Sequence, residues 1–259
     1  MNADEKGMKI LLAIPCYNCE TQIARVLSAV QESKVKVNET WVVDNGSADN
    51  TVNVAVGAKK LLANLRVFVN TENINLGGTH KAVFQQARMD GFTHVVILHG
   101  DDQASAHEIQ GLLNASVQSG GKTVLGSRFM KGSQLHGYDI KRILGNRCLN
   151  LIYSLSAKRN LSDLGSGLNL FRLSDLAPET YLKFGNTLSF NYELILDFVR
   201  RRVSFVYFPI TWREVDQTSN ARNVKIFVEA TKILGRWIIR RPTSSSQMFE
   251  KKYSWTEVR

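Results

Sequence analysis

Two adjacent carboxylates and an amide follow directly on an apolar run near the middle of the chain. The run Val95–Leu98 leads through His99 and a glycine into Asp101, Asp102 and Gln103. Carboxylate and amide oxygens are hard ligands, of the kind that Mg²⁺ or Mn²⁺ prefers when protein and substrate phosphates share the ion. Such an ion would neutralise the charge of a departing phosphorylated group. A turn and helix cap is the alternative interpretation, because Asp and Gln are common there.

Two further polar clusters each follow an apolar run. After Ile14 the chain continues with Pro15, Tyr17, Asn18 and Glu20. The ring of Tyr17 could stack on a base, or pack with its hydroxyl in water.

After Val43 comes Asp44, whose carboxylate could accept hydrogen bonds from a base or a ribose. Asp49, five residues on, is expected to cap the next helix, which is a structural role.

Several common motifs are missing or incomplete. No G-x-G-x-x-G follows a strand, which disfavours a dinucleotide site. Gly121-Lys122-Thr123 ends like a P-loop, but Ser116 replaces its first glycine and a strand follows instead of a helix. Three cysteines (Cys16, Cys19 and Cys148) give no disulfide framework and no four-thiolate zinc site, and they suit a reducing cytoplasm. We interpret the C-x-x-C spacing of the first two as incidental.

The elements that must position these clusters alternate between strands and helices. Continuous apolar strands between helical patterns predict an α/β fold with a doubly wound, mostly parallel sheet flanked by helices. Ligands bind such sheets at the carboxyl ends of the strands, where the clusters stand. The expected strands are 9–14, 39–43, 65–69, 93–98 and 122–125, and the expected helices are 20–31, 51–62, 79–89 and 107–118.

The pattern is looser in the second half of the chain. A mobile loop is expected at 132–138, followed by helices at 142–155, 193–201 and 224–239 and by strands at 165–171 and 203–208. We predict one domain over residues 1–241, with a C-terminal helical extension. Residues 242–259 are expected to form a polar tail, disordered or loosely docked.

Charge and hydropathy narrow the class of protein. The 259 residues carry a formal charge of +10, which favours nucleic acid, an anionic membrane face or phosphorylated substrates. No aromatic pattern of a nucleic-acid module accompanies the basic residues, so we expect no nucleic acid partner. The polar N-terminus and the lack of an apolar run of ~20 residues predict a cytoplasmic protein. The helix at 224–239 mixes apolar and basic residues, which fits contact with an anionic membrane or, slightly better, a helix that closes the core.

Eight motifs in register resemble those of the family-2 glycosyltransferases. The later ones are similar to the dolichol-phosphate-mannose-synthase-like branch, and the resemblance covers residues 8 to 235. The motifs are Pro15-x-Tyr17-Asn18, Val43–Ser47 with Asp49 and Thr51, Asn73-x-x-Leu76-Gly77-Gly78, the Asp101 cluster, Gly126-Ser127-Arg128, Asp163–Leu170, Phe190-x-x-Glu193 and Phe208-Pro209-Ile210-x-Trp212-Arg213.

The resemblance implies a GT-A fold and assigns roles to the clusters. Asp101 would bind Mg²⁺ or Mn²⁺ with Gln103 nearby, and Arg128 would meet the diphosphate or the anion of the acceptor. One departure concerns the metal, because the usual D-x-D begins where His99 stands; Asp102 could compensate for it. The nucleoside pocket would be lined by Pro15, Tyr17, Asn18, Glu20 and Asp44, and the rest of the donor site would include Gly78, Asp101 and Asp102.

Asp163 and Glu193 are the candidates for acid–base work. Inverting transfer to a hydroxyl needs a base, whereas transfer to an ionised phosphate needs none. Asp163 is the favoured candidate, and an anchor for the following turn is its alternative role; Glu193 could instead be an exposed helix residue.

We therefore expect an inverting glycosyltransferase that moves a sugar from a nucleotide-diphosphate donor to a lipid-linked acceptor, polyprenyl phosphate or a lipid-linked glycan. It would serve cell-envelope polysaccharide synthesis through peripheral contact with the anionic inner face of the membrane. A nucleotidyltransferase on the same fold, or a catalytically degenerate scaffold, are the alternatives.

Overall fold

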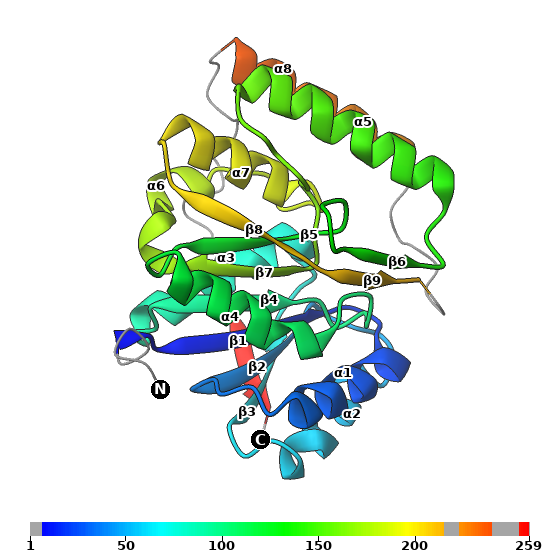
Figure 1. Cartoon of the computed structure of the whole chain (residues 1–259). Helices are drawn as coiled ribbons and strands as arrows, with labels where there is room; N and C mark the ends of the chain where they lie inside the picture. Colours follow the sequence, from blue (N-terminus) through cyan, green and yellow to red (C-terminus); the bar gives the residue numbers. More distant parts are fainter. Residues whose placement is uncertain (1–6, 215–222, 240–253, 259) are drawn as a thin grey trace.

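The computed structural model describes residues 7–214, 223–239 and 254–258, and its centre is a twisted sheet of eight strands (Figure 1). The strand order is β10-β3-β2-β1-β4-β7-β5-β8, and β6 and β9 form a separate pair. The strands are β1 (Ile10–Cys16), β2 (Glu39–Asp44), β3 (Leu65–Asn70), β4 (His94–Leu98), β5 (Thr123–Ser127), β6 (Gln134–His136), β7 (Leu168–Arg172), β8 (Phe205–Pro209), β9 (Thr211–Arg213) and β10 (Trp255–Val258).

Helices cover both faces of this sheet, which explains the continuous apolar strands. Leu12 and Ile14 of β1 face a core shared with α1, α2 and α4, whereas Leu11 and Ala13 face a core shared with α3, α5, α6, α7 and α8. The predicted doubly wound sheet is confirmed. The helices are α1 (Glu20–Ser33), α2 (Thr51–Gly57), α3 (Asn75–Met89), α4 (Ile109–Gln118), α5 (Ile140–Ala157), α6 (Pro178–Tyr181), α7 (Phe190–Arg200) and α8 (Asn223–Ile238).

The first four strands are parallel, and their carboxyl ends lie at one edge of the sheet. β1 pairs with β2 on one side and with β4 on the other, so the strand order reverses its direction at β1. This is the position at which open α/β sheets bind ligands. The polar clusters that follow β1, β2 and β4 are therefore brought together by topology.

The second half of the sheet is mixed in direction. β7 runs antiparallel to both β4 and β5, whereas β5 and β8 are parallel. The prediction of a mobile loop at 132–138 was wrong, because Gln134–His136 form strand β6, which pairs in parallel with β9. This pairing places Glu214, which follows β9, beside the loop after β4.

The last described residues correct the expected tail. Trp255–Val258 add β10 as an antiparallel edge strand beside β3, while residues 240–253 lie outside the described part. The ring of Trp255 stacks on Phe68 at 4.9 Å, and Arg66 holds Glu257 at 2.9 Å. A tryptophan in an otherwise polar tail gains a buried neighbour this way, which stabilises the docked end. The boundary between domain and tail stays a prediction.

Candidate active site

The loops after β1 and β2 are held together by reciprocal hydrogen bonds. The Asn18 amide donates to Ser47 Oγ at 2.8 Å, and Asn18 Oδ1 accepts from the Ala48 amide at 2.9 Å. Asn18 has a φ of +51°, a left-handed conformation that Asn adopts more readily than most residues. The two predicted donor-binding loops therefore form one rigid rim.

Glu20 and Asp49 cap the two helices that leave this rim. Asp49 accepts from the Thr51 amide at the start of α2 and from the Glu20 amide at the start of α1, both at 3.1 Å. Glu20 Oε2 accepts in return from the Asn50 amide at 2.9 Å. The structural role predicted for Asp49 is confirmed, and Glu20 shares it; contact of Glu20 with a nucleoside stays a prediction.

Asp44 is fully buried at the end of β2, and its own loop uses both of its oxygens. One oxygen accepts from the amides of Gly46 and Ser47, at 3.0 and 2.9 Å, and the other accepts from the Ser47 hydroxyl. A nucleoside would therefore have to share or replace the Ser47 contact to bond this carboxylate. Direct recognition by Asp44 stays a prediction.

Pro15 lies near the end of β1 and Tyr17 follows the strand, and the two side chains differ in exposure. Pro15 is buried and its carbonyl accepts from the Gly100 amide at 3.0 Å, which ties the β1 and β4 ends together. A Cβ at Gly100 would overlap Cys16 Sγ, so this close approach needs glycine. Tyr17 is 43% exposed, so part of the side chain is accessible to a base, and stacking on a base stays a prediction.

Asp101 lies at the carboxyl end of β4 and is only partly exposed. It accepts a hydrogen bond from the Gln103 amide at 3.2 Å. Burial raises the pKa of Asp101 to about 6, and the nearby charges of Asp102 and Glu214 add to this effect. A carboxylate that is costly to ionise gains most from an added cation, so Asp101 fits a divalent metal. The Gln103 side chain lies 3.5 Å from Glu214, and its contact with a metal stays a prediction.

The neighbouring acids already have cationic partners. Asp102 has a left-handed φ of +59° and accepts from Arg25 Nε of α1 at 2.7 Å. Glu214 pairs with Arg142 of α5 at 2.6 Å and lies 3.5 Å from Gln103 Nε2. Arg25 would therefore compete with a metal for Asp102, and compensation for His99 by Asp102 stays a prediction. In the described ranges no three His, Cys, Asp or Glu side chains are grouped to hold a metal, so an ion at Asp101 would need ligands from the substrate.

His99 packs against a second histidine, His80, which no motif in the sequence marks. The rings of His99 and His80 of α3 are 5.7 Å apart, and His99 Nε2 and both His80 nitrogens are buried without a hydrogen-bond partner. Burial, with the charge of Arg128, lowers the pKa of His99 to about 4. His99 is therefore a neutral side chain where the related motif has a carboxylate, and its contact with a metal stays a prediction. His80 carried no signal in the sequence, because a lone helix histidine is usually a packing residue.

Arg128 and Asp163 form a buried, two-pronged ion pair. The Asp163 carboxylate accepts from Arg128 Nε at 2.7 Å and Nη2 at 2.8 Å, and from the Arg128 and Gly165 amides at 2.9 and 3.0 Å. Four such bonds fit the anchoring role better than that of a free base, because a base must expose an oxygen to the acceptor. The catalytic assignments of Asp163 and Arg128 stay predictions.

Glu193 is buried on α7, so the alternative of an exposed helix residue was wrong. It accepts from the Gly185 amide at 2.7 Å, and Arg236 of α8 lies 3.9 Å away. Burial raises the pKa of Glu193. Lys81 of α3, also buried, donates to the Phe184 carbonyl, so both side chains fix the segment before α7. A catalytic role for Glu193 stays a prediction.

The same segment explains the glycines at the start of α3. The Gly77 amide donates to the Asn186 carbonyl at 2.8 Å, and a Cβ on Gly77 would lie 2.7 Å from Phe190 Cβ. A Cβ on Gly78 would lie 2.9 Å from Ile74 Cβ. Close packing thus requires glycine at both positions, and contact of Gly78 with the donor stays a prediction.

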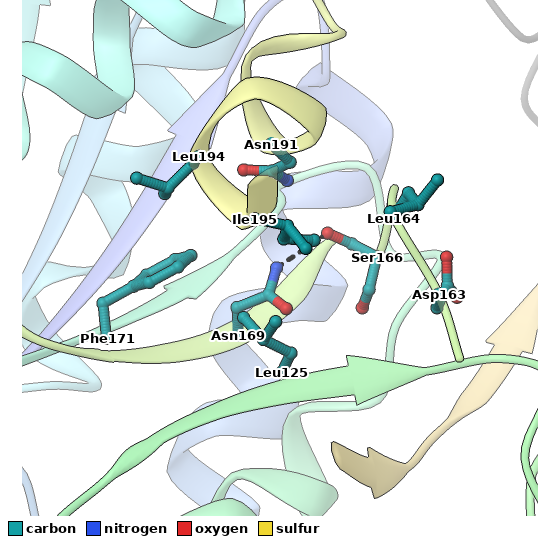
Figure 2. A pocket seen from close by; sticks show the side chains of 9 residues that line it. All are labelled: Leu125, Asp163, Leu164, Ser166, Asn169, Phe171, Asn191, Leu194 and Ile195. Atoms are coloured by element: carbon teal, nitrogen blue, oxygen red, sulfur yellow. Dashed lines mark hydrogen bonds between the residues drawn. The ribbon is translucent and has the colours of Figure 1, made fainter. Parts of the chain in front are cut away.

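A small internal cavity lies behind the Asp163 loop, between α7 and strands β5 and β7 (Figure 2). Its volume of about 10 Å³ has room for about one water molecule. Asn191 Oδ1, buried without a hydrogen-bond partner, lines it. The cavity is a small gap in the packing behind the Asp163 loop, and it is too small for a donor nucleotide.

Known proteins resemble this chain over most of its length. Polyprenol monophosphomannose synthase of Mycolicibacterium smegmatis is 23% identical over 237 residues, which cover 90% of this chain and 88% of that protein. Dolichyl-phosphate beta-glucosyltransferase of Saccharomyces cerevisiae is 24% identical over 245 residues, which cover 84% and 71%.

Solved structures share the fold. Glucosyl-3-phosphoglycerate synthase from Mycobacterium tuberculosis, in complex with phosphoglyceric acid, superposes with a TM-score of 0.67 at 18% identity, covering 94% of this chain and 84% of that one. The same enzyme was solved with Mn²⁺, UDP-glucose and phosphoglyceric acid, and that structure gives a TM-score of 0.65 at 17% identity, covering 94% and 83%.

The family model described as glycosyl transferase family 2 matches residues 12–177, more than half of the chain. That range includes the loops after β1 and β2, the Asp101 cluster and the Arg128–Asp163 pair. The predicted GT-A fold, the nucleotide-sugar-dependent glycosyltransferase and the similarity to the dolichol-phosphate-mannose-synthase-like branch are confirmed. The chain belongs to glycosyl transferase family 2.

Proposed function

We propose that this enzyme transfers a sugar, with inversion, from a nucleotide-diphosphate donor to a lipid-linked acceptor. The observation that carries the proposal is Asp101, a carboxylate with a raised pKa at the carboxyl end of β4, beside the rim that the β1 and β2 loops form. The rim offers the exposed ring of Tyr17 to a base, and Asp101 lies where a donor diphosphate would bring its charge.

Mg²⁺ or Mn²⁺ would be held by Asp101 with Gln103, and when bound it would neutralise the departing diphosphate. The solved relatives contain Mn²⁺ or Mg²⁺ with UDP, which supports this assignment. His99 is neutral where a D-x-D has a carboxylate, so the negative charge that the protein would contribute is lower than a D-x-D would give.

A phosphate is the acceptor that this site suits best. The Asp163 carboxylate is fully engaged by Arg128 and by backbone amides, and Glu193 is engaged by Gly185. A phosphate acceptor is already ionised and requires neither as a base. The names of the two sequence relatives, one acting on a polyprenol and one on a dolichyl phosphate, agree with this choice. The natural role would be in cell-envelope polysaccharide synthesis, at the inner face of the membrane.

The direct test offers labelled nucleotide sugars with Mn²⁺ to the purified enzyme, together with either polyprenyl phosphate or a lipid-linked oligosaccharide. Transfer to polyprenyl phosphate is expected, with a rate that shows no enzymatic base titrating between pH 6 and 9. Transfer solely to the oligosaccharide would refute the phosphate acceptor. Folded enzyme that neither transfers sugar nor hydrolyses any donor would favour the degenerate scaffold suggested by His99.

A further inference from the structure

Helix α5 exposes a continuous apolar stripe to solvent. Ile140, Leu144, Leu151 and Leu155 are between 58% and 71% exposed. Their spacing of four, seven and four residues places them on one side of the helix, and Cys148, also exposed, fills the gap between them. The stripe spans 15 residue steps, about 22 Å at 1.5 Å per residue. Apolar surface of this extent on a helix marks a contact with a partner or a membrane.

The opposite side of α5 is firmly packed, so the stripe is held outward. Leu149, Tyr153 and Ala157 are buried, and the Tyr153 hydroxyl donates to the Ala230 carbonyl of α8 at 2.7 Å. The two helices lie side by side at the end of the molecule farthest from β3 (Figure 1). α8 buries Ala230, Ile233 and Leu234, which agrees with the core-closing interpretation. Its other side exposes Phe227, Val228 and Ile238.

The charges around the stripe identify the partner. α5 carries Lys141, Arg142 and Arg147 and contains no Asp or Glu. Lys141 and Arg147 are exposed, whereas Arg142 is paired with Glu214. Leucines flanked by cations match the interface of an anionic bilayer, where apolar side chains enter the acyl region and cations meet lipid phosphates. A second copy of the chain would oppose its own cations on α5 with no acid there to pair them.

No helix in the described ranges is long and apolar enough to cross a membrane. The stripe therefore suits a helix that lies in the plane of the interface.

The first turn of α5 also reaches the active site. Arg142 pairs with Glu214, whose carboxylate lies 3.5 Å from Gln103 Nε2. Tyr138, two residues before α5, lies 3.4 Å from Arg128 Nη1. A lipid surface on this helix would thus be adjacent to Arg128, which by the family resemblance would meet the donor diphosphate or the anion of the acceptor.

We propose that the α5 stripe docks the enzyme on an anionic membrane, lying flat at the lipid headgroups. Only the purpose of this docking rests on the proposed lipid-linked acceptor; the docking itself needs neither donor nor acceptor.

Cys148 allows a direct test, because it is the exposed one of the three cysteines and lies within the stripe. An environment-sensitive fluorophore on Cys148 is expected to shift to the blue when vesicles of phosphatidylglycerol and phosphatidylcholine are added. Pure phosphatidylcholine vesicles should give a much smaller shift. The control is Cys148→Ser with Met89→Cys, since Met89 is 72% exposed on a different helix, α3; its probe should not respond.

A stripe variant, with Gln in place of Leu144, Leu151 and Leu155, should lose vesicle co-sedimentation by about tenfold or more, since even partial burial of three leucines is worth that much. These residues are exposed, so the variant should fold, and its transfer to a short-chain acceptor in detergent should be unchanged. Met89→Gln is the matched surface control and should bind vesicles normally. Failure of wild type to bind anionic vesicles overturns the proposal. So does sedimentation of wild type as a dimer that the stripe variant abolishes. Wild type that binds anionic vesicles but transfers no sugar to polyprenyl phosphate would count against the proposed acceptor instead.

Discussion

Replacing Asp101 by Asn should stabilise the metal-free enzyme above pH 6 while it removes activity. The structure raises the pKa of Asp101 from its ordinary 3.8 to about 6, mainly by burial. Between those two values the folded state binds more protons at this site than the unfolded state does. Stability is therefore lost as the pH rises through this window, and the full penalty is present above pH 6. Asparagine has no such ionisation and can still accept the hydrogen bond from the Gln103 amide.

The size of the effect follows from the shift. Two pKa units correspond to ~3 kcal/mol, and because Asp101 is partly exposed, screening reduces our expectation to about 1–2 kcal/mol. Urea denaturation with a chelator present, at pH 4, 6 and 8, should show the stabilising effect at pH 8 and almost none at pH 4. With Mn²⁺ and nucleoside diphosphate the order should reverse, because wild type gains stability from the bound ligands and the variant does not.

Asp90→Asn is a suitable control, because this carboxylate lies at the end of α3 and bonds only its neighbour Gln86 among the side chains described. It should leave stability nearly unchanged at every pH. A difference between Asp101→Asn and wild type that is independent of pH would refute the reasoning, since it would show that packing and not ionisation is responsible. Turnover should fall by about two orders of magnitude, the scale of losing one preorganised electrostatic contact; near-normal turnover would remove Asp101 from the metal site.

Three further outcomes follow from the site. Asp163→Asn should destabilise the fold by about 3–5 kcal/mol, because Arg128 is left buried without its counter-charge. If denaturation shows only a marginal loss of stability while turnover falls strongly, Asp163 acts as a base. His99→Asp should tighten Mg²⁺ binding about tenfold, the scale of one charged contact, in calorimetry with nucleoside diphosphate; unchanged affinity would show that this position does not reach the metal. Gly77→Ala should lower the melting temperature, because its Cβ would lie 2.8 Å from facing backbone, whereas Gly57→Ala, helical and with open space around it, should be neutral or stabilising.

The sequence determined the parallel half of the sheet and the place of its clusters. Strands such as β1 and β4 are buried on both faces, so their apolar runs are continuous and end where polar residues begin. That local pattern predicts both the strand and the loop after it. The direction of β7 could not be predicted, because the alternation of side chains is the same in parallel and antiparallel strands.

Short strands that depend on partners distant in the chain could not be predicted from the sequence either. β6 and β9 are three residues each, and they pair across more than seventy residues of chain. β10 lies in a polar tail, and only the aromatic surface of β3 and its neighbours gives its tryptophan a place to pack.

What each polar side chain does was decided by the tertiary structure. Residue type and spacing indicated that four carboxylates could do chemistry, but did not show which role each one has. These are Asp101, Asp102, Asp163 and Glu193. The fold pairs Asp102 with Arg25, seventy-seven positions away, and Asp163 with Arg128, thirty-five positions away. Glu193 lies 3.9 Å from Arg236, so of these four carboxylates Asp101 is the one with no ion pair to a residue that the structure describes. The charge state and reach of a carboxylate depend on burial and on neighbours distant in sequence, and these exist only once the chain has packed.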